Sequence, residues 1–223
     1  MIPLYDTTRT RAFPLVNLGL ILLNALVFFG ELQMTTSTLQ NFIFTWGLIP
    51  ANLLTDPAGT WKTIFSSMFL HGGWFHIISN MWVLFIFGDN VEARLGKLRY
   101  LIFYLLSGVA AVLLQAYVQP TSQAPMIGAS GAIAGVLGAY LILFPGSRIA
   151  SLVPILFILT IVEVPALIFL AFWFITQLYS GLFAMQGGGA SGIAWWSHIG
   201  GFLFGMLMVS FFARARPSMR IRA

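Results

Sequence analysis

The hydrophobic positions of this chain fall into six long runs separated by shorter polar segments. The runs cover residues 13–31, 74–87, 100–118, 130–144, 164–185 and 195–212. A helix needs roughly 20 mainly apolar residues to cross a bilayer, because the hydrocarbon core is about 30 Å thick. The pattern therefore predicts an all-α polytopic membrane protein with six spanning helices. We expect a single domain over residues 1–223, since six spans leave no room for a large soluble one.

Two further apolar stretches do not read as spans. Residues 149–161 are apolar and rich in β-branched side chains. This stretch is too short to cross a bilayer, so we expect a loop that dips into the membrane interface. The connection between the first two spans contains NFIFTWGLIPANLL. An apolar segment with an aromatic residue favours the membrane surface, and we expect this first loop to be half-embedded.

Composition supports the membrane prediction. Hydrophobic residues make up 59% of the chain and charged residues 8%, whereas a soluble domain has about 25% charged residues. So few charges cannot cover the surface of a soluble enzyme, and the same composition excludes a disordered or fibrous protein. The chain contains no Cys, which excludes disulfides, thiolate catalysis and zinc sites built on Cys.

The positions of the basic residues predict the orientation of the chain. The net charge is +5, which in so apolar a chain indicates basic cytoplasmic loops rather than nucleic-acid binding. With six spans, both termini share one side with the second-to-third and fourth-to-fifth connections. Only Lys62 falls on the opposite side, and the shared side carries the other ten of the eleven basic residues: Arg9, Arg11, Arg94, Lys97, Arg99, Arg148, Arg214, Arg216, Arg220 and Arg222. The positive-inside rule therefore predicts cytoplasmic termini.

A serine and a histidine stand at the outer ends of two predicted spans. Ser130 begins the fourth span, and His198 lies near the start of the sixth. Each is followed by glycines at helical spacing, which let neighbouring helices approach closely; these glycines are Gly131, Gly135, Gly138, Gly201 and Gly205. We expect the two spans to pack glycine to glycine and to bring Ser130 against His198. A serine beside a histidine in a dry site is an activated nucleophile and its base.

Several donors can serve an oxyanion at the same place. Ser130 follows Gly128 in the turn where a helix begins, and N–H groups of a first turn have no helical partner. His76 and Asn80 are four residues apart and therefore share a helix face, again at the outer side. Acyl transfer needs such donors. No Asp or Glu is positioned to orient His198, so the sequence predicts a dyad; Asp89, Glu92 and Glu163 fall at the cytoplasmic side as interface residues.

Each feature also has a purely structural interpretation. The tetrapeptide around Ser130 can simply pack helices. His198, beside Trp195 and Trp196, can be an interfacial anchor. Asn80 can hydrogen-bond between helices, and His71 can be solvated at a membrane boundary. The coincidence of the serine, the histidines and the asparagine on one side of the membrane favours the functional interpretation.

Taken together, these motifs resemble those of rhomboid intramembrane serine proteases. The resemblance rests on Trp61-Lys62-Thr63, MFLHGGWFHIISNMWVLFIFGDNVEARLG (68–96), GASGAIAG (128–135) and SHIGGFLFG (197–205), in the family's order. It implies that Ser130 is the nucleophile, that His198 is the general base, and that the oxyanion hole comprises His76, Asn80 and the Ser130 backbone N–H. The supporting residues that it implies are His71, Gly128, Gly131, Gly201 and Gly205.

The resemblance also implies a six-helix bundle around a water-filled cavity that opens to the outer side. Its implied substrates are membrane proteins with a transmembrane helix, and its implied location is a prokaryotic plasma membrane. It implies no metal, cofactor or nucleic acid, and the sequence does not indicate an oligomeric state.

The chain departs from the family pattern at two positions. Lys62 stands where the family has an arginine, and it lacks the planar fork of a guanidinium. Ala134 stands one turn after Ser130, where an aromatic side chain often stacks on the catalytic histidine. We expect an aromatic residue at position 134 to raise turnover if the cavity has room, or to clash if the helices are in tight contact.

Two other classes of protein remain possible from the sequence. A catalytically inactive rhomboid-like protein that binds membrane proteins would lack Ser130 or His198, and both are present. A small transporter with a histidine proton relay should show inverted repeats and an acidic partner within the spans, and neither is visible.

Overall fold

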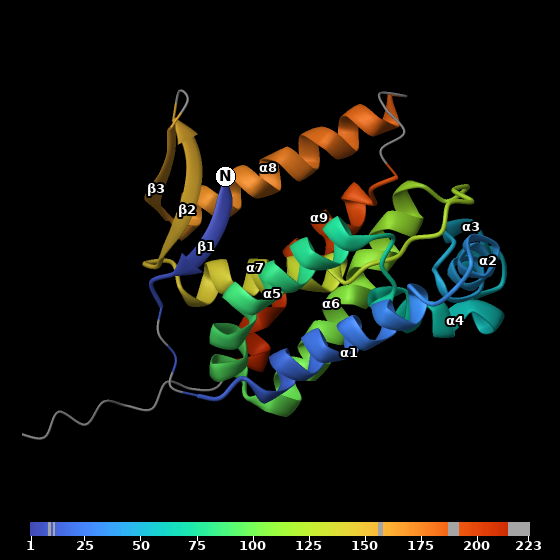
Figure 1. Cartoon of the computed structure of the whole chain (residues 1–223), viewed down its shortest axis with the longest axis horizontal. Coiled ribbons are helices and arrows are strands. Elements are labelled where there is room, and N and C mark those ends of the chain that lie inside the picture. Colours follow the sequence, from blue (N-terminus) through green and yellow to red (C-terminus); the bar gives the residue numbers. More distant parts are fainter. Residues whose placement is uncertain (9, 11, 156–157, 187–191, 214–223) are drawn as a thin grey trace, which may run out of the picture.

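Six helices account for the six hydrophobic runs (Figure 1). The computed structural model describes residues 1–8, 10, 12–155, 158–186 and 192–213. The helices that match the runs are α1 (Leu15–Glu31), α5 (Trp74–Leu95), α6 (Lys97–Val118), α7 (Ser130–Leu143), α8 (Ala166–Met185) and α9 (Trp195–Phe212). The largest difference is at α5, which continues to Leu95 instead of ending at residue 87. Its last turns contain polar residues that interrupt the apolar run but are buried, among them Asn90 and Glu92.

The lengths of the helices indicate a polytopic membrane protein. Among the described residues, α6, α8 and α9 are each long and apolar enough to cross a membrane. A fourth candidate forms if α5 is taken together with the preceding segment Pro57–Phe69, from which it is bent by 81°. Both α1 and α7 are shorter apolar helices. Six crossings therefore stay a prediction, whereas the helical membrane character is clear.

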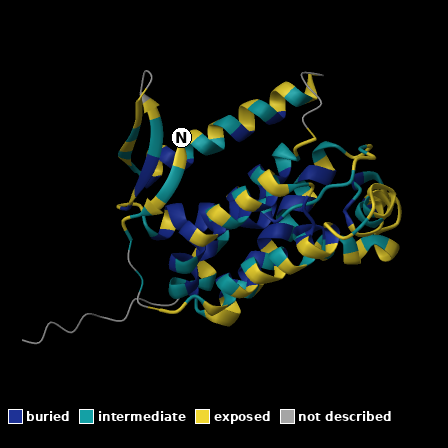
Figure 2. Cartoon of the chain, in the orientation of Figure 1, coloured by how far each residue is buried: buried dark blue, intermediate teal, exposed yellow. Residues whose placement is uncertain are grey.

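Helix α7 lies at the centre of the bundle. Twelve of its fourteen residues are buried, and it packs against α5, α6, α8 and α9. The outer helices alternate buried and exposed positions, as Figure 2 shows. A helix that is buried on nearly every face needs apolar or small residues on every face. Its sequence is then one continuous hydrophobic run, as residues 130–144 are.

Glycines bring α7 and α9 into backbone contact. A Cβ added to Gly201 would overlap the carbonyl oxygen of Gly131, and a Cβ on Gly205 would overlap that of Gly135. A Cβ on Gly138 would likewise overlap the carbonyl oxygen of Phe202. The expected glycine-to-glycine packing of these two helices is therefore confirmed, and it leaves no space for side chains between the two backbones.

The expectation of a loop over residues 149–161 is wrong. The chain forms two strands there, β2 (Arg148–Ile155) and β3 (Ile158–Pro165), and an N-terminal strand, β1 (Ile2–Asp6), pairs with β2. All pairings are antiparallel in the order β1-β2-β3, with Ile2 opposite Leu152 and Asp6 opposite Ile149. The β-branched residues favour strands, and the pairing satisfies backbone groups that an isolated apolar loop would leave unpaired.

The long connection between the first two spans is helical. It contains α2 (Thr36–Trp46), α3 (Pro50–Thr55), α4 (Pro57–Ser66) and the 3-10 turn η1 (Ser67–Phe69). Thr35 caps α2, and Asp56 caps α4 by accepting the N–H of Gly59 at 2.9 Å. These helices lie at the end of the molecule opposite the sheet (Figure 1). Half-embedding of this segment stays a prediction.

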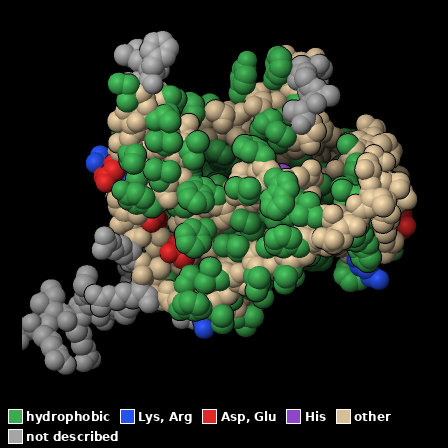
Figure 3. Space-filling view, in the orientation of Figure 1, with side chains coloured by type: hydrophobic (Ala, Val, Ile, Leu, Met, Phe, Trp, Pro, Cys, Tyr) green, Lys and Arg blue, Asp and Glu red, His purple; other side chains and the backbone are tan. Residues whose placement is uncertain are grey.

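On the face that Figure 3 shows, hydrophobic side chains cover most of the surface, and the few charged ones lie toward the sheet end and at the opposite end. Arg94 lies over the ring of Phe144, and Arg99 donates to the carbonyl oxygen of Phe212 at 3.5 Å. The α5–α6 junction, the end of α7 and the end of α9 are thus neighbours, as the orientation argument requires. Lys97 begins α6 and Arg148 begins β2. The other six basic residues of that argument lie outside the described residues: Arg9, Arg11, Arg214, Arg216, Arg220 and Arg222.

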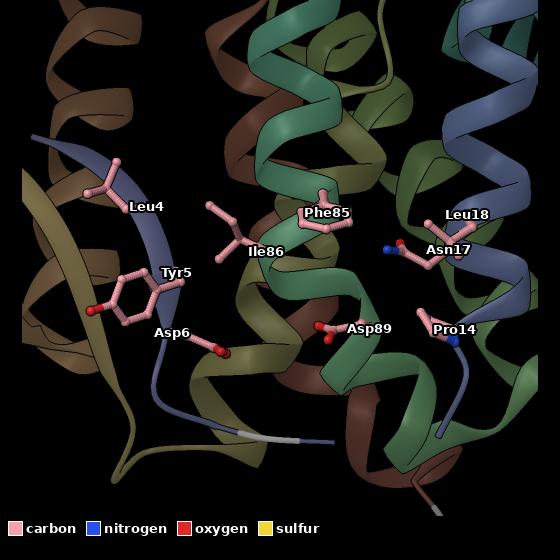
Figure 4. Close-up of a pocket in the computed structure, with 9 residues that line it drawn as sticks. All are labelled: Leu4, Tyr5, Asp6, Pro14, Asn17, Leu18, Phe85, Ile86 and Asp89. Carbon is pink, nitrogen blue, oxygen red and sulfur yellow. The ribbon is translucent and has the colours of Figure 1, made fainter. Parts of the chain in front are cut away.

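A cleft of about 270 Å³ lies at the sheet end, between β1, α1 and α5 (Figure 4). The carboxylates of Asp6 and Asp89 both line it. Asp6 accepts hydrogen bonds from the Tyr140 hydroxyl and, at 2.9 Å, from the amide of Asn90. Burial raises the pKa of Asp6 from 3.8 to about 6. These bonds attach the N-terminal segment to α5 and α7.

We predict that Gly201→Ala destabilises the protein, because the new methyl group would collide with the backbone of α7. Overpacking of this kind costs about 1–3 kcal/mol, and thermal unfolding in detergent should show a lower Tm. The matched control is Gly19→Ala in α1, where a Cβ meets nothing within 4 Å. An equal Tm for wild type and Gly201→Ala would contradict the backbone contact.

Candidate active site

A glycine turn sets the position of Ser130. The N–H of Gly128 donates to the carbonyl oxygen of Ser67 at 2.8 Å, and α7 begins at Ser130 two residues later. Gly128 has a φ of +116°, which side-chain-bearing residues rarely adopt. A Cβ at this position would also lie 2.5 Å from Nε2 of His76. Both the backbone angle and the lack of space therefore require glycine at position 128, two residues before the serine.

His198 lies against Ser130, as the glycine spacing predicts. Its Nε2 atom is 2.8 Å from Oγ of Ser130, which is hydrogen-bonding distance. The two side chains come from the starts of α7 and α9, and the backbone contact between these helices sets their separation. The arrangement lets the imidazole accept the hydroxyl proton, which makes the serine oxygen a nucleophile.

Two α8 residues that the sequence interpretation missed also contact His198. The Nδ1 atom lies 2.7 Å from Oε1 of Gln177, and the Trp173 ring is tilted at 35° to the imidazole with centroids 6.1 Å apart. Trp195 meets the same imidazole edge-on, also at 6.1 Å. The missed signal was an amide and an indole four residues apart within an apolar run, which places both on one face of the helix.

His76 and Asn80 border the turn that precedes Ser130. Gly72 donates its N–H to Nδ1 of His76 over a long 3.4 Å, which leaves Nε2 on the side of Gly128. Nδ2 of Asn80 is buried and has no hydrogen-bond partner among the described residues; it lies 3.7 Å from where a Cβ of Gly128 would be. In the described part of the chain, neither the His76 nor the Asn80 side chain forms a hydrogen bond with Ser130. Both place N–H groups against Gly128, two residues before the serine, and the oxyanion hole that the sequence predicts stays a prediction.

His71 supports His76 rather than facing Ser130. Its ring is 1% exposed and meets the His76 ring edge-on, with centroids 4.9 Å apart. Its backbone N–H donates to both carboxylate oxygens of Glu31, each at 3.2 Å. Glu31, a buried acid at the end of α1, was not singled out in the sequence because it ends an apolar run like an ordinary boundary residue.

The other carboxylates lie away from the Ser130–His198 pair. Glu92 accepts the N–H groups of Val16 and Asn17, at 3.1 and 2.7 Å, and so caps the start of α1. Glu163 faces Arg148 across the β2–β3 hairpin at 3.9 Å. The described part of the chain holds no group of three or more His, Asp or Glu residues suited to a metal ion.

Fold and site together define an integral membrane protein whose helical bundle holds a hydrogen-bonded serine and histidine. Comparison with known families extends this description, because the Rhomboid domain matches residues 58–215. The match covers more than half of the chain and includes every candidate site residue. The chain therefore belongs to the rhomboid family.

Individual relatives show how far the similarity reaches. The candidate rhomboid protease YdcA of Bacillus subtilis is 32% identical over 135 residues, covering 60% of this chain and 64% of that protein. The rhomboid protease AarA of Providencia stuartii is 32% identical over 143 residues, covering 57% of this chain and 50% of that protein. RHOMBOID-like protein 5 of Arabidopsis thaliana is 34% identical over 88 residues, covering 40% of this chain and 28% of that protein. The matches span less than two thirds of these relatives' own lengths.

The structure favours a clash over improved stacking at position 134. Ala134 is fully buried, and His198 already has Trp173 and Trp195 beside it. We therefore predict that Ala134→Phe lowers the free energy of unfolding by about 1–3 kcal/mol, measured as a lower Tm. The control is Ile142→Phe on the same helix, where the side chain is 42% exposed. Raised turnover with an unchanged Tm would show that the cavity has room for a ring.

Proposed function

We propose that this protein is an intramembrane serine endopeptidase that cleaves transmembrane segments of membrane-protein substrates. The observation that carries the proposal is the 2.8 Å contact between Oγ of Ser130 and Nε2 of His198. Membership of the rhomboid family, which includes proteins named as proteases, supports the same reaction class. The presence of both reacting side chains argues against a catalytically inactive homologue.

The reaction begins with proton transfer inside this pair. Nε2 of His198 takes the hydroxyl proton while the Ser130 oxygen attacks the carbonyl carbon of the scissile peptide bond. The carbonyl oxygen becomes an oxyanion. When the tetrahedral intermediate collapses, the C–N bond breaks, His198 returns the proton to the leaving amine, and the acyl group stays on Ser130 as an ester. Water, deprotonated by the same imidazole, then releases the carboxylic acid and restores the hydroxyl.

Three donors are available for the oxyanion. The backbone N–H of Ser130 belongs to the first turn of α7, where N–H groups have no helical partner and the helix dipole is positive. The side chains of His76 and Asn80 lie on the other side of the Gly128 turn. Donors held in place before the reaction stabilise charge without reorganising, and the unpartnered amide of Asn80 is suited to that role.

The proposal extends to the membrane setting. The Ser130–His198 pair lies toward the end of the bundle away from the sheet, and the described basic residues of α5, α6 and β2 lie toward the sheet end. The positive-inside rule then puts both termini in the cytoplasm and the site at the outer side. A prokaryotic plasma membrane fits this compact arrangement. Substrates with a single transmembrane helix could reach Ser130 from the bilayer.

We predict that Ser130→Ala and His198→Ala each abolish proteolysis of a transmembrane substrate and leave the protein folded. Each should also abolish labelling by a fluorophosphonate probe, because the probe needs an activated serine. The double variant should be no worse than either single one, since the two residues act as a unit. Retention of more than about a hundredth of the wild-type kcat by either variant would contradict the dyad.

We predict that Asn80→Ala lowers kcat by about 10²–10³, the usual effect of losing one oxyanion donor, without abolishing activity. The other two donors remain. Proteoliposome assays with a defined substrate would measure the change. The matched control is Asn24→Ala, which removes a buried asparagine of α1 whose amide donates to the Leu20 carbonyl oxygen at 2.8 Å. Equal kcat values for Asn80→Ala and wild type would assign Asn80 a purely structural role.

A further inference from the structure

We infer that Gln177 is a positioning residue that holds His198 in the one neutral tautomer able to accept the serine proton. The expected effect of Gln177 on turnover rests on the proposed proteolytic function. The contact between Gln177 and His198 does not depend on that function. Gln177 comes from α8, a helix that contributes no residue to the dyad or to the oxyanion donors. Its Oε1 atom is 2.7 Å from Nδ1 of His198, opposite the nitrogen that faces Ser130.

The orientation of the Gln177 amide follows from its other contacts. Its Nε2 atom lies 3.3 Å from the carbonyl oxygen of Trp173 and 3.2 Å from Oγ1 of Thr176. The carbonyl oxygen only accepts, so it needs the NH₂ end of the amide. A flipped amide would set two carbonyl oxygens against each other. The amide oxygen therefore faces His198, as the distances require.

That orientation decides where the imidazole proton lies. An amide oxygen accepts hydrogen bonds and cannot donate them, so Nδ1 of His198 must carry the hydrogen. Neutral imidazole has one N–H, and Nε2 is then left with its lone pair directed at the Ser130 hydroxyl. The opposite tautomer would present N–H to the serine and could not take its proton. Gln177 thus supplies the acceptor that an aspartate supplies in a serine triad, without the negative charge.

The burial of Gln177 supports a specific role. Its side chain is 7% exposed within an apolar helix, and a buried amide costs free energy unless its donors and acceptors are paired. Trp173, one turn earlier on the same face, contacts both His198 and Phe202, with ring centroids 6.1 and 5.7 Å apart. One face of α8 therefore presents both a flat ring and a hydrogen-bond acceptor to the imidazole.

The test compares Gln177→Met, which has nearly the same shape without an acceptor, with Gln177→Glu, which keeps the acceptor. The control is Gln186→Met, the same change at the exposed C-terminal end of α8. Purified protein in lipid is assayed for kcat and KM, and ¹⁵N NMR of labelled histidine reports which ring nitrogen of His198 is protonated. His198→Ala identifies the signal.

We expect wild type to show the proton on Nδ1 and Gln177→Met to show a mixture of tautomers. The Met variant should lose about 10- to 100-fold in kcat, by analogy with the loss of a partner that orients a metal-binding histidine, with KM unchanged. Gln177→Glu should restore kcat to within a few-fold of wild type, and Gln186→Met should change neither readout.

Two results would overturn the inference. One is a neutral wild-type His198 that carries its proton on Nε2. This measurement uses wild type alone and does not depend on any variant folding. The other is a Gln177→Met protein with wild-type kcat and tautomer. Failure of the proposed function is distinguishable, because wild type would then show no proteolysis and no fluorophosphonate labelling while the tautomer measurement still decided the role of Gln177.

Discussion

The contact between the backbones of α7 and α9 is the constraint on which the site depends. Ser130 and His198 stand at the starts of these helices, so their 2.8 Å separation is set by how closely the helix axes approach. The approach is possible because Gly131 and Gly135 face Gly201 and Gly205 without side chains between them. In a bilayer, such close packing also provides much of the attraction between helices. The same contact therefore stabilises the bundle and aligns the reacting atoms.

The polar atoms of the site depend on partners drawn from different helices. His198 has Ser130 on one ring nitrogen and Gln177 on the other, and Trp173 beside its face. His76 is backed by His71, whose backbone is held by Glu31. Each catalytic candidate thus has a neighbour that limits its rotation. Asn80 differs, because its amide is buried beside the Gly128 turn with no partner among the described residues, as a donor waiting for a substrate oxygen would be.

Local sequence patterns predicted what depends on local interactions. The six apolar runs identified the helices, because a helix forms from residues close together in the chain. The glycine spacing within two of the runs identified the helix faces that meet in the α7–α9 contact. Strand β1 was missed because residues 2–6 find their partner near residue 150, and a strand beside a distant segment leaves no periodic signal. Strands β2 and β3 pair locally, but their β-branched run was interpreted as a loop because it is too short to cross a bilayer. The end of α5 was missed because polar residues such as Glu92 are buried by bonding to α1. Gln177 escaped notice because only charged side chains were considered as partners for His198.

The pairing of β1 with β2 has a consequence for biogenesis. Residues 2–6 are synthesised before residues 140–152, yet Asp6 bonds Tyr140 and its strand pairs with residues 149–152. Translation adds about 5–20 residues per second, so on the order of ten seconds separates the emergence of the two strands. During that interval β1 lacks its partner strand, and α1, α5 and α6 are synthesised without that pairing. Strand β1 therefore completes its contacts only after α7 and β2 have been synthesised.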